Sequence, residues 1–510
     1  MDATTTVVVG HSDDRTLGRS DTRTLGHSAD RTLGHSDTRT LVRSDIRSLA
    51  RRDVVRQFDG RHSVTSTSMS MSFADIERDV ARAKKLARVD ATRIEGVRAF
   101  ARAIERATMS SSSSSSFDSS SFKASPASDD DDVAATIGEW MMECAREFAK
   151  EYPVERLSAT SVERERERCG KSAKMCADAR EAYERDGDDA RRATGVAAAL
   201  SAQVEYERLA TSERGGEAFA AFARDALERA RVACDEATAR VAEHHEDYFP
   251  SLWNAADARL KCAEHAAEEG DFARASLMYD EMSIAYQRAC GFADASRGDD
   301  LGGFLYDWGC SLTSAAQFIV LSAHAHAHED AMRTIDTAVE KLKHAAKFSL
   351  GAMEPLNAIG DAYQAKAEIF IARGDAREAG ECLLLALSEG FARALKASSL
   401  DLDANIGCGE VYLELGRLYV SIGDESSARE NFESAWRAYQ KAMANTKDDP
   451  GTCEERFGVV YNAACAANLA GHRAVALDLI ENLIACGGAT RDGVDADPDL
   501  RSHIQHCSSS

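Results

Sequence analysis

Strand-forming patterns and proline are both scarce in this sequence. Proline occurs six times in 510 residues, and alternating apolar and polar stretches typical of strands are almost missing. Ala, Glu and Arg, which favour helices, are abundant. Hydrophobic residues make up 44% of the chain and charged residues 29%, a balance that permits a buried core. The composition therefore predicts an all-α protein, with length for about two or three ordinary domains or one long repeat array.

Paired cysteines, long apolar runs and a secretion signal are missing as well. The thirteen cysteines stand singly, and several of them, such as Cys144 and Cys234, fall on apolar helical stripes. An odd, scattered set is typical of reduced core cysteines in an intracellular protein. We therefore expect a cytoplasmic location, with an organelle such as a plastid or mitochondrion as the alternative. No run of eighteen apolar residues predicts a transmembrane helix, and the N-terminus lacks a hydrophobic signal core.

Motifs that carry catalysis are also lacking. We find no Gly-rich phosphate loop, no Gly-x-Ser-x-Gly and no His-Glu-x-x-His motif. His324 and His328 would share one face of a helix and could hold a metal ion, but no carboxylate completes an obvious ligand set. A polar connection between helices is the favoured interpretation of this stretch. The sequence thus predicts a non-enzymatic protein without a cofactor or metal.

Positive charge is deficient over most of the chain. The net charge is -23, yet residues 1–125 hold 21 Lys/Arg against 16 Asp/Glu, a net +5. Residues 126–510 hold 41 Lys/Arg against 69 Asp/Glu, a net charge of -28. A body this acidic repels phosphate backbones and argues against nucleic-acid binding. It would suit a basic partner, although solubility alone also explains the charge.

Low-complexity segments divide the chain. Residues 11–50 are a tandem octapeptide of the type His-Ser-Asp-Asp-Arg-Thr-Leu-Gly, whose period matches no helix face. Seven serines at 110–116 and four aspartates at 129–132 cannot bury apolar area. We expect a disordered octapeptide-repeat tail at 1–72, an isolated amphipathic helix at 73–107 and a Ser/Asp-rich linker at 108–132. A long-helix segment at 133–249, a helical repeat domain at 250–487 and a C-terminal tail at 488–510 are expected to follow.

A glycine turn recurs in the last half of the chain. The turns stand at Gly270-Asp271, Gly374-Asp375, Gly423-Asp424 and Gly471-His472. The last three lie 49 and 48 residues apart, and the first two lie 104 apart, which leaves one turn concealed near residue 325. A small residue stands seven positions before each glycine, and apolar residues stand five, nine and twelve positions after it. This pattern predicts five helical hairpins, each with a close-contact notch on its first helix and an apolar stripe on its second.

The unit from Tyr412 to Ala435 identifies the kind of repeat. It reads Tyr-x2-Leu-Gly-x2-Tyr-x3-Gly-Asp-x3-Ala-x3-Phe-x2-Ala and resembles the tetratricopeptide repeat (TPR) family. Weaker copies centre on Ala263, Ala367 and Ala464. The resemblance covers about 250–487 and implies an α-α superhelix, a TPR-like solenoid of helical hairpins, following a disordered N-terminal region. The spacing of 48 to 52 residues exceeds the 34 of the family, so longer helices are expected.

The resemblance implies a protein–protein interaction scaffold that binds a partner segment. If the family geometry holds, the first helices line a concave face, and their polar residues form the expected partner-binding set: Asn357, Asp361, Gln364, Glu368, Glu410, Arg417 and Asn468. Such an acidic face would take a basic or amphipathic peptide. The alternative is a structural helical protein that self-associates through long helices at 157–248, which could form a coiled hairpin.

Overall fold

The computed structural model describes the chain from residue 130 onward with short interruptions. It describes residues 78–84, 99, 103–104, 130–149, 159–186, 188–211, 216–242, 245, 248–293, 299–321, 326–348, 353–445 and 453–500. All described residues belong to one compact unit. The octapeptide tail expected over 1–72 and the serine run lie outside the described residues.

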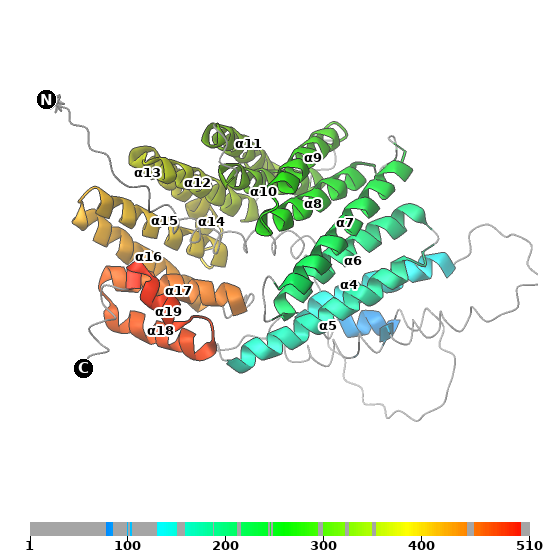
Figure 1. Cartoon of the computed structure of the whole chain (residues 1–510), viewed down its shortest axis with the longest axis horizontal. Helices are drawn as coiled ribbons and strands as arrows, with labels where there is room; N and C mark the ends of the chain where they lie inside the picture. Colours follow the sequence, from blue (N-terminus) through cyan, green and yellow to red (C-terminus); the bar gives the residue numbers. More distant parts are fainter. Residues whose placement is uncertain are drawn as a thin grey trace, which may run out of the picture. The chain divides into compact units, whose positions relative to one another are not determined.

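Helices make up the ordered structure, and no strand occurs in the described ranges. They are coloured in chain order in Figure 1. Their bounds are α4 Asp130–Ala149, α5 Ala159–Tyr183, α6 Asp189–Ala210, α7 Glu217–Arg240, α8 Tyr248–Glu268, α9 Phe272–Cys290, α10 Asp299–Leu321, α11 Ala327–Phe348, α12 Glu354–Arg373, α13 Ala376–Leu385, η3 Ala386–Phe391, α14 Ala392–Ala397, α15 Leu402–Ser421, α16 Glu425–Asn445, α17 Cys453–Ala470, α18 Arg473–Cys486 and α19 Arg491–Ala496. No described helix is long and apolar enough to span a membrane.

The helices form an array of hairpins. Each packs mainly against its neighbours in sequence, and alternate helices also touch: α4 with α6, α6 with α8, α8 with α10, α10 with α12, α12 with α15 and α15 with α17. We call these alternate members the first helices and their partners the second helices. The all-α solenoid of hairpins expected from the sequence is confirmed. The same pattern of contacts already includes α4 to α7, upstream of the repeats recognised from residue 250.

The glycine turns have the backbone that the repeat requires. Gly270, Gly374, Gly423 and Gly471 all have positive φ, between 76° and 95°, the left-handed conformation that favours glycine at the end of a helix. After the first three of these glycines an aspartate precedes the next helix: the carboxylate of Asp424 accepts a hydrogen bond from the Ser427 amide at 3.0 Å, as an N-cap does. The Gly-Asp pair therefore ends one helix and starts the next.

The small residues and apolar stripes lie where the pattern predicts. Ala263, Ala367, Gly416 and Ala464 are buried, as are the second-helix positions five, nine and twelve after each turn glycine. At Gly416 the fit is so close that an added Cβ would lie 2.4 Å from Cε1 of Phe432. The notch thus admits an aromatic ring of the paired helix.

One second helix is interrupted, which the sequence did not indicate. Between α13 and α14 the chain makes the π-helical turn η3, and its Phe391 enters the space beside two glycines. A Cβ at Gly360 or Gly407 would lie 2.5 or 2.3 Å from that ring. The extra residue of a π turn shifts the side chains that follow it, and here the ring fills the seam between α12 and α15.

The start of the described region packs on α4. Of the amphipathic helix expected over 73–107, residues 78–84 are helical. Val80 and Ala83 are buried in one cluster with Ile137 and Trp140 of α4. Their apolar spacing thus serves contact with the first hairpin.

Candidate interaction surface

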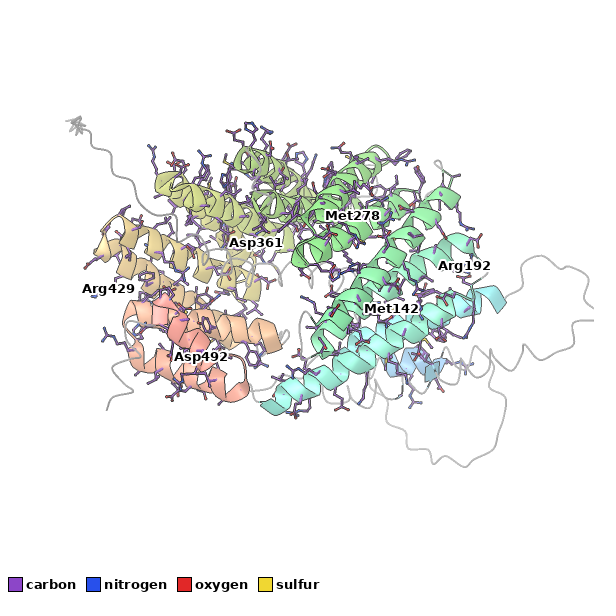
Figure 2. The ribbon with its side chains drawn as sticks, in the orientation of Figure 1. Met142, Arg192, Met278, Asp361, Arg429 and Asp492 are labelled. Carbon is purple, nitrogen blue, oxygen red and sulfur yellow. The ribbon has the colours of Figure 1, made fainter. Side chains whose placement is uncertain are left out.

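A carboxylate recurs at one position of three of the first helices, α8, α12 and α15. Asp257, Asp361 and Glu410 each stand six residues before the buried small residue of their hairpin. Because the first helices touch one another along the array, equivalent positions follow each other on one side of it. We call these three residues the acidic row; Figure 2 marks its Asp361 on α12. All three are half-buried, and Asp257 lies 3.1 Å from the ammonium of Lys261.

The remaining predicted binding residues on α12 differ in exposure. Gln364 is half-buried and Glu368 is exposed, so Glu368 adds charge beside the acidic row. Asn357, in contrast, is 2% exposed. Its Nδ2 donates to Oδ1 of Asp401 at 2.9 Å, and the same oxygen caps α15 through the Ala404 amide. Asn357 thus joins α12 to the start of α15.

Arg417 and Asn468 contact the C-terminal segment of the chain itself. Arg417 forms ion pairs with Glu414 and with Asp499. Asn468 is 4% exposed and donates to the main-chain oxygen of Asp499 at 2.6 Å. Two residues predicted to bind a partner therefore already hold a peptide segment in this structure.

Sequence reasoning passed over three other residues at this place. The ligand atoms of Cys465, Asp497 and Asp499 lie within 4.8 Å of one another. The Asp497 carboxylate accepts a hydrogen bond from the Tyr461 hydroxyl at 2.8 Å, and Asp499 is paired with Arg417. Burial raises the pKa of the Cys465 thiol well above its usual range. The two carboxylates have protein partners and the thiol stays protonated, so the chemistry here is that of an ion-paired contact. Only the tertiary structure brings residues of α15, α17 and the C-terminus together.

A buried carboxyl occupies the seam between α8, α9 and α10. Glu264 Oε1 accepts a hydrogen bond from Ser314 at 2.9 Å, and that hydroxyl lies 3.1 Å from the Tyr279 hydroxyl. Its other oxygen, Oε2, is buried without a hydrogen-bond partner. Burial, opposed by the Ser314 contact and assisted by nearby Asp257, Glu268 and Glu205, raises the pKa of Glu264 to about 8. This group is therefore mostly neutral at pH 7.

The position of Glu264 recurs in other hairpins with different residues. Glu264, Glu368 and Arg417 each follow directly after the buried small residue of the first helix. The first is half-buried with its carboxyl enclosed between helices, the second is exposed and the third is ion-paired. The repeat thus reuses one backbone position for three chemical environments.

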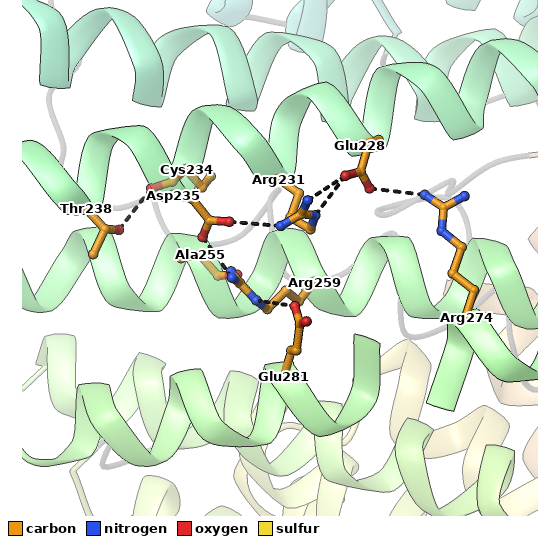
Figure 3. A network of polar contacts seen from close by, with 9 residues as sticks. All are labelled: Glu228, Arg231, Cys234, Asp235, Thr238, Ala255, Arg259, Arg274 and Glu281. Carbon is orange, nitrogen blue, oxygen red and sulfur yellow. Dashed lines mark hydrogen bonds and ion pairs between the residues drawn. The ribbon is translucent and has the colours of Figure 1, made fainter. Parts of the chain in front are cut away.

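An ion-pair network joins α7, α8 and α9 (Figure 3). Arg231 lies between Glu228 and Asp235 on α7. Arg259 of α8 contacts Asp235 at 2.8 Å and Glu281 of α9 at 3.3 Å. Arg274 of α9 adds a third arginine, 3.1 Å from Glu228, so the charges balance and we assign the network to helix packing.

The two histidines considered as metal ligands do not form a described site. His324 lies outside the described residues, and His328 is half-buried on α11. The neighbouring His326 lies 3.2 Å from Glu329, three residues further along the chain. This is a local contact between polar residues at the start of α11. This arrangement is that of a polar helix connection.

Comparison with known proteins identifies no sequence relative. No family model matches the chain, and no curated protein matches it. Solved structures that resemble it include BtubC (BKLC) from P. vanneervenii, at 19% identity, with 52% of this chain and 93% of that chain covered and a TM-score of 0.31. A signal-transduction ATPase (STAND) with a tetratricopeptide repeat sensor from Pyrococcus horikoshii has 12% identity, coverage of 77% and 46%, and a TM-score of 0.35. The nuclear import adaptor Nro1 from S. pombe has 11% identity, coverage of 72% and 94%, and a TM-score of 0.28.

Proposed function

We propose that this TPR-like array is a protein–protein interaction scaffold whose first-helix face binds a basic or amphipathic segment of a partner. The acidic row carries the proposal. Three carboxylates at one repeat position, with Glu368 beside them, give this part of the face an excess of negative charge over Lys261, which pairs with Asp257. A partner rich in Arg or Lys would associate faster and in better register with such a face than an acidic one would.

The described chemistry gives no competing enzymatic proposal. The titratable groups with strongly raised pKa values, such as Glu264 and Cys234, are enclosed between helices. A reaction centre would need such a group beside a nucleophile and a substrate-sized opening. Binding is therefore the function that these residues support best.

The test reverses the charge of the face and compares it with an equal change elsewhere. Asp361, Glu368 and Glu410 are replaced by Lys in one full-length protein. The control replaces Glu378, Glu430 and Glu481, which are exposed on second helices, by Lys. Partners are recovered by affinity capture and quantified by mass spectrometry at low and high salt. We expect basic partners to fall at least tenfold with the first protein alone; equal recovery with both proteins would refute the proposal.

The self-association alternative stays a prediction for α5 to α7. In the array these helices bury Ala173, Ala199 and Ala230 against their neighbours, so a dimer would have to use their remaining faces. Sedimentation velocity across a hundredfold range of protein concentration distinguishes the two: a constant monomer mass supports the scaffold, and a dimer lost on charge reversal in α5 to α7 supports self-association. The expected cytoplasmic location is tested by imaging a tagged full-length chain.

A further inference from the structure

The C-terminal segment covers the last face of the array. Residues 491–500 include α19, which lies over α17 and α18 (Figure 1). Val494 and Leu500 are fully buried in one apolar cluster with Ala464, Ile480 and Leu483. In a repeat array each hairpin covers the apolar face of the one before it. Here about ten residues perform that role for the last hairpin.

Side chains of α15 and α17 hold this segment by polar contacts as well. Asn468 Nδ2 donates a hydrogen bond to the main-chain oxygen of Asp499 at 2.6 Å. This contact recognises the backbone and is independent of the side chain at position 499. Arg417 pairs with the Asp499 carboxylate, and the Tyr461 hydroxyl donates to Asp497 at 2.8 Å. Charge-assisted contacts of this kind are the stronger class of hydrogen bond.

These contacts together select a particular chemistry. The polar groups turned toward the segment are donors, so a segment must supply carboxylates and a carbonyl oxygen to satisfy them. The apolar residues Ala464, Ile480 and Leu483 accept a Leu side chain at the same time. An Asp-x-Asp-Leu sequence meets both demands, and a basic segment would leave Arg417 opposed by like charge.

We propose that this surface is a peptide-binding site for acidic Asp-x-Asp-Leu segments, occupied here by the chain's own residues 497–500. We call it the end site and define it by Arg417, Tyr461, Asn468, Ala464, Ile480 and Leu483. An acidic segment supplied in trans competes with the resident one for these contacts. The end site shares none of these residues with the acidic row and takes a ligand of opposite charge, so each proposal can fail without the other.

Because residues 497–500 are covalently joined to the end site, peptide binding has to be measured in a chain whose own segment is weakened. A segment joined to its site by a short connection has an effective concentration of roughly millimolar. A free peptide at micromolar concentration therefore competes poorly with the resident segment in the wild-type chain. Weakening the resident segment in cis uncovers the site for a peptide in trans.

The experiment uses the full chain with Leu500→Asp, which places a charge in the buried apolar position and releases the segment. A fluorescent peptide of residues 489–502 is titrated and its anisotropy followed. We expect the variant to bind at least tenfold more tightly than the wild type. Adding Asn468→Ala should lower the affinity at least tenfold, and a peptide with Asn at positions 497 and 499 should bind no better than a scrambled one.

Two outcomes would overturn the end site. One is a variant with wild-type helical circular dichroism that does not bind the peptide. The other is equal binding of the acidic peptide and its Asn version, which would reduce the contact to apolar capping. If Leu500→Asp loses helical structure, the milder Leu500→Ala replaces it in the same titration. Hydrogen exchange of α17 then provides a second readout, since release should speed exchange there and added peptide should slow it again.

Discussion

Replacing Glu264 by Gln should change how the stability of the array depends on pH. The carboxyl has a pKa of about 8 in the folded protein, against 4.5 for an ordinary glutamate. Between these values the unfolded chain is ionised and the folded chain is protonated. Each unit of rising pH in that range therefore favours unfolding by about 1.4 kcal/mol. This destabilisation is absent below pH 4.5 and complete above pH 8.

The magnitude follows from the span of the two pKa values. An upper limit of about 5 kcal/mol applies above pH 8. The partial exposure of the Glu264 side chain reduces it, so we expect a difference of about 2 kcal/mol between pH 5 and pH 8. Gln cannot ionise, and it keeps the oxygen that accepts from Ser314. Near pH 5 it leaves a buried amide donor without a partner, at a cost of about 1–3 kcal/mol. Glu264→Gln should thus be destabilising at pH 5 and should gain about 2 kcal/mol relative to wild type between pH 5 and pH 8.

Urea denaturation at pH 5, 6.5 and 8 measures the effect. A repeat array need not unfold in one step, so hydrogen exchange in α8 to α10 should accompany it. Glu368→Gln is the matched control, because it has the same repeat position but is exposed on α12. If wild type and Glu264→Gln lose stability in parallel as the pH rises, Glu264 is ionised in the folded protein, and the reasoning from its burial is wrong.

Three further perturbations test the packing. Gly423→Ala should destabilise the protein by about 1 kcal/mol because φ is +80° there. Gly380→Ala, inside α13 with open space around it, should stabilise it by about 0.5–1 kcal/mol. Thermal melts that show the same shift for both variants would contradict the turn assignment. Asn357→Ala should cost about 1–3 kcal/mol because Asp401 loses a buried donor, and an unchanged melting temperature would place Asn357 on a free surface instead. Iodoacetamide at pH 8 should label exposed Cys290 well before buried Cys234, because burial raises the pKa of the Cys234 thiol to about 12. Peptide mass spectrometry that shows Cys234 modified first would contradict its burial.

Local chemistry explains the part of the fold that was predictable. The turn between two helices of a hairpin depends on a few adjacent residues, a Gly with positive φ and the Asp that caps the next helix. The Gly-Asp pairs therefore indicated the hairpins. Stripes such as Ala428, Phe432 and Ala435 recur at helical spacing, so they revealed the buried side of the second helices. The π turn at Phe391 left no such local sign, because the glycines that make room for its ring, Gly360 and Gly407, lie on other helices.

The predicted binding set shows where local reasoning ends. Helical periodicity placed Asn357, Arg417 and Asn468 on first helices together with Asp361 and Glu410, and it could not tell which of them another segment covers. Asn357 is buried by a partner 44 residues away, and Asn468 by one 31 residues away.

By itself the sequence determined the all-α class, the hairpin turns and their buried stripes, because these follow from backbone preference and periodicity within about fifty residues. The tertiary structure decided the rest. It raised the pKa of Glu264 by enclosing the carboxyl between α8, α9 and α10, and it turned Arg417 and Asn468 toward the chain's own C-terminal segment. The electrostatic environment and accessibility of a side chain depend on what packs over it, and in a repeat array that neighbour comes from the next hairpin.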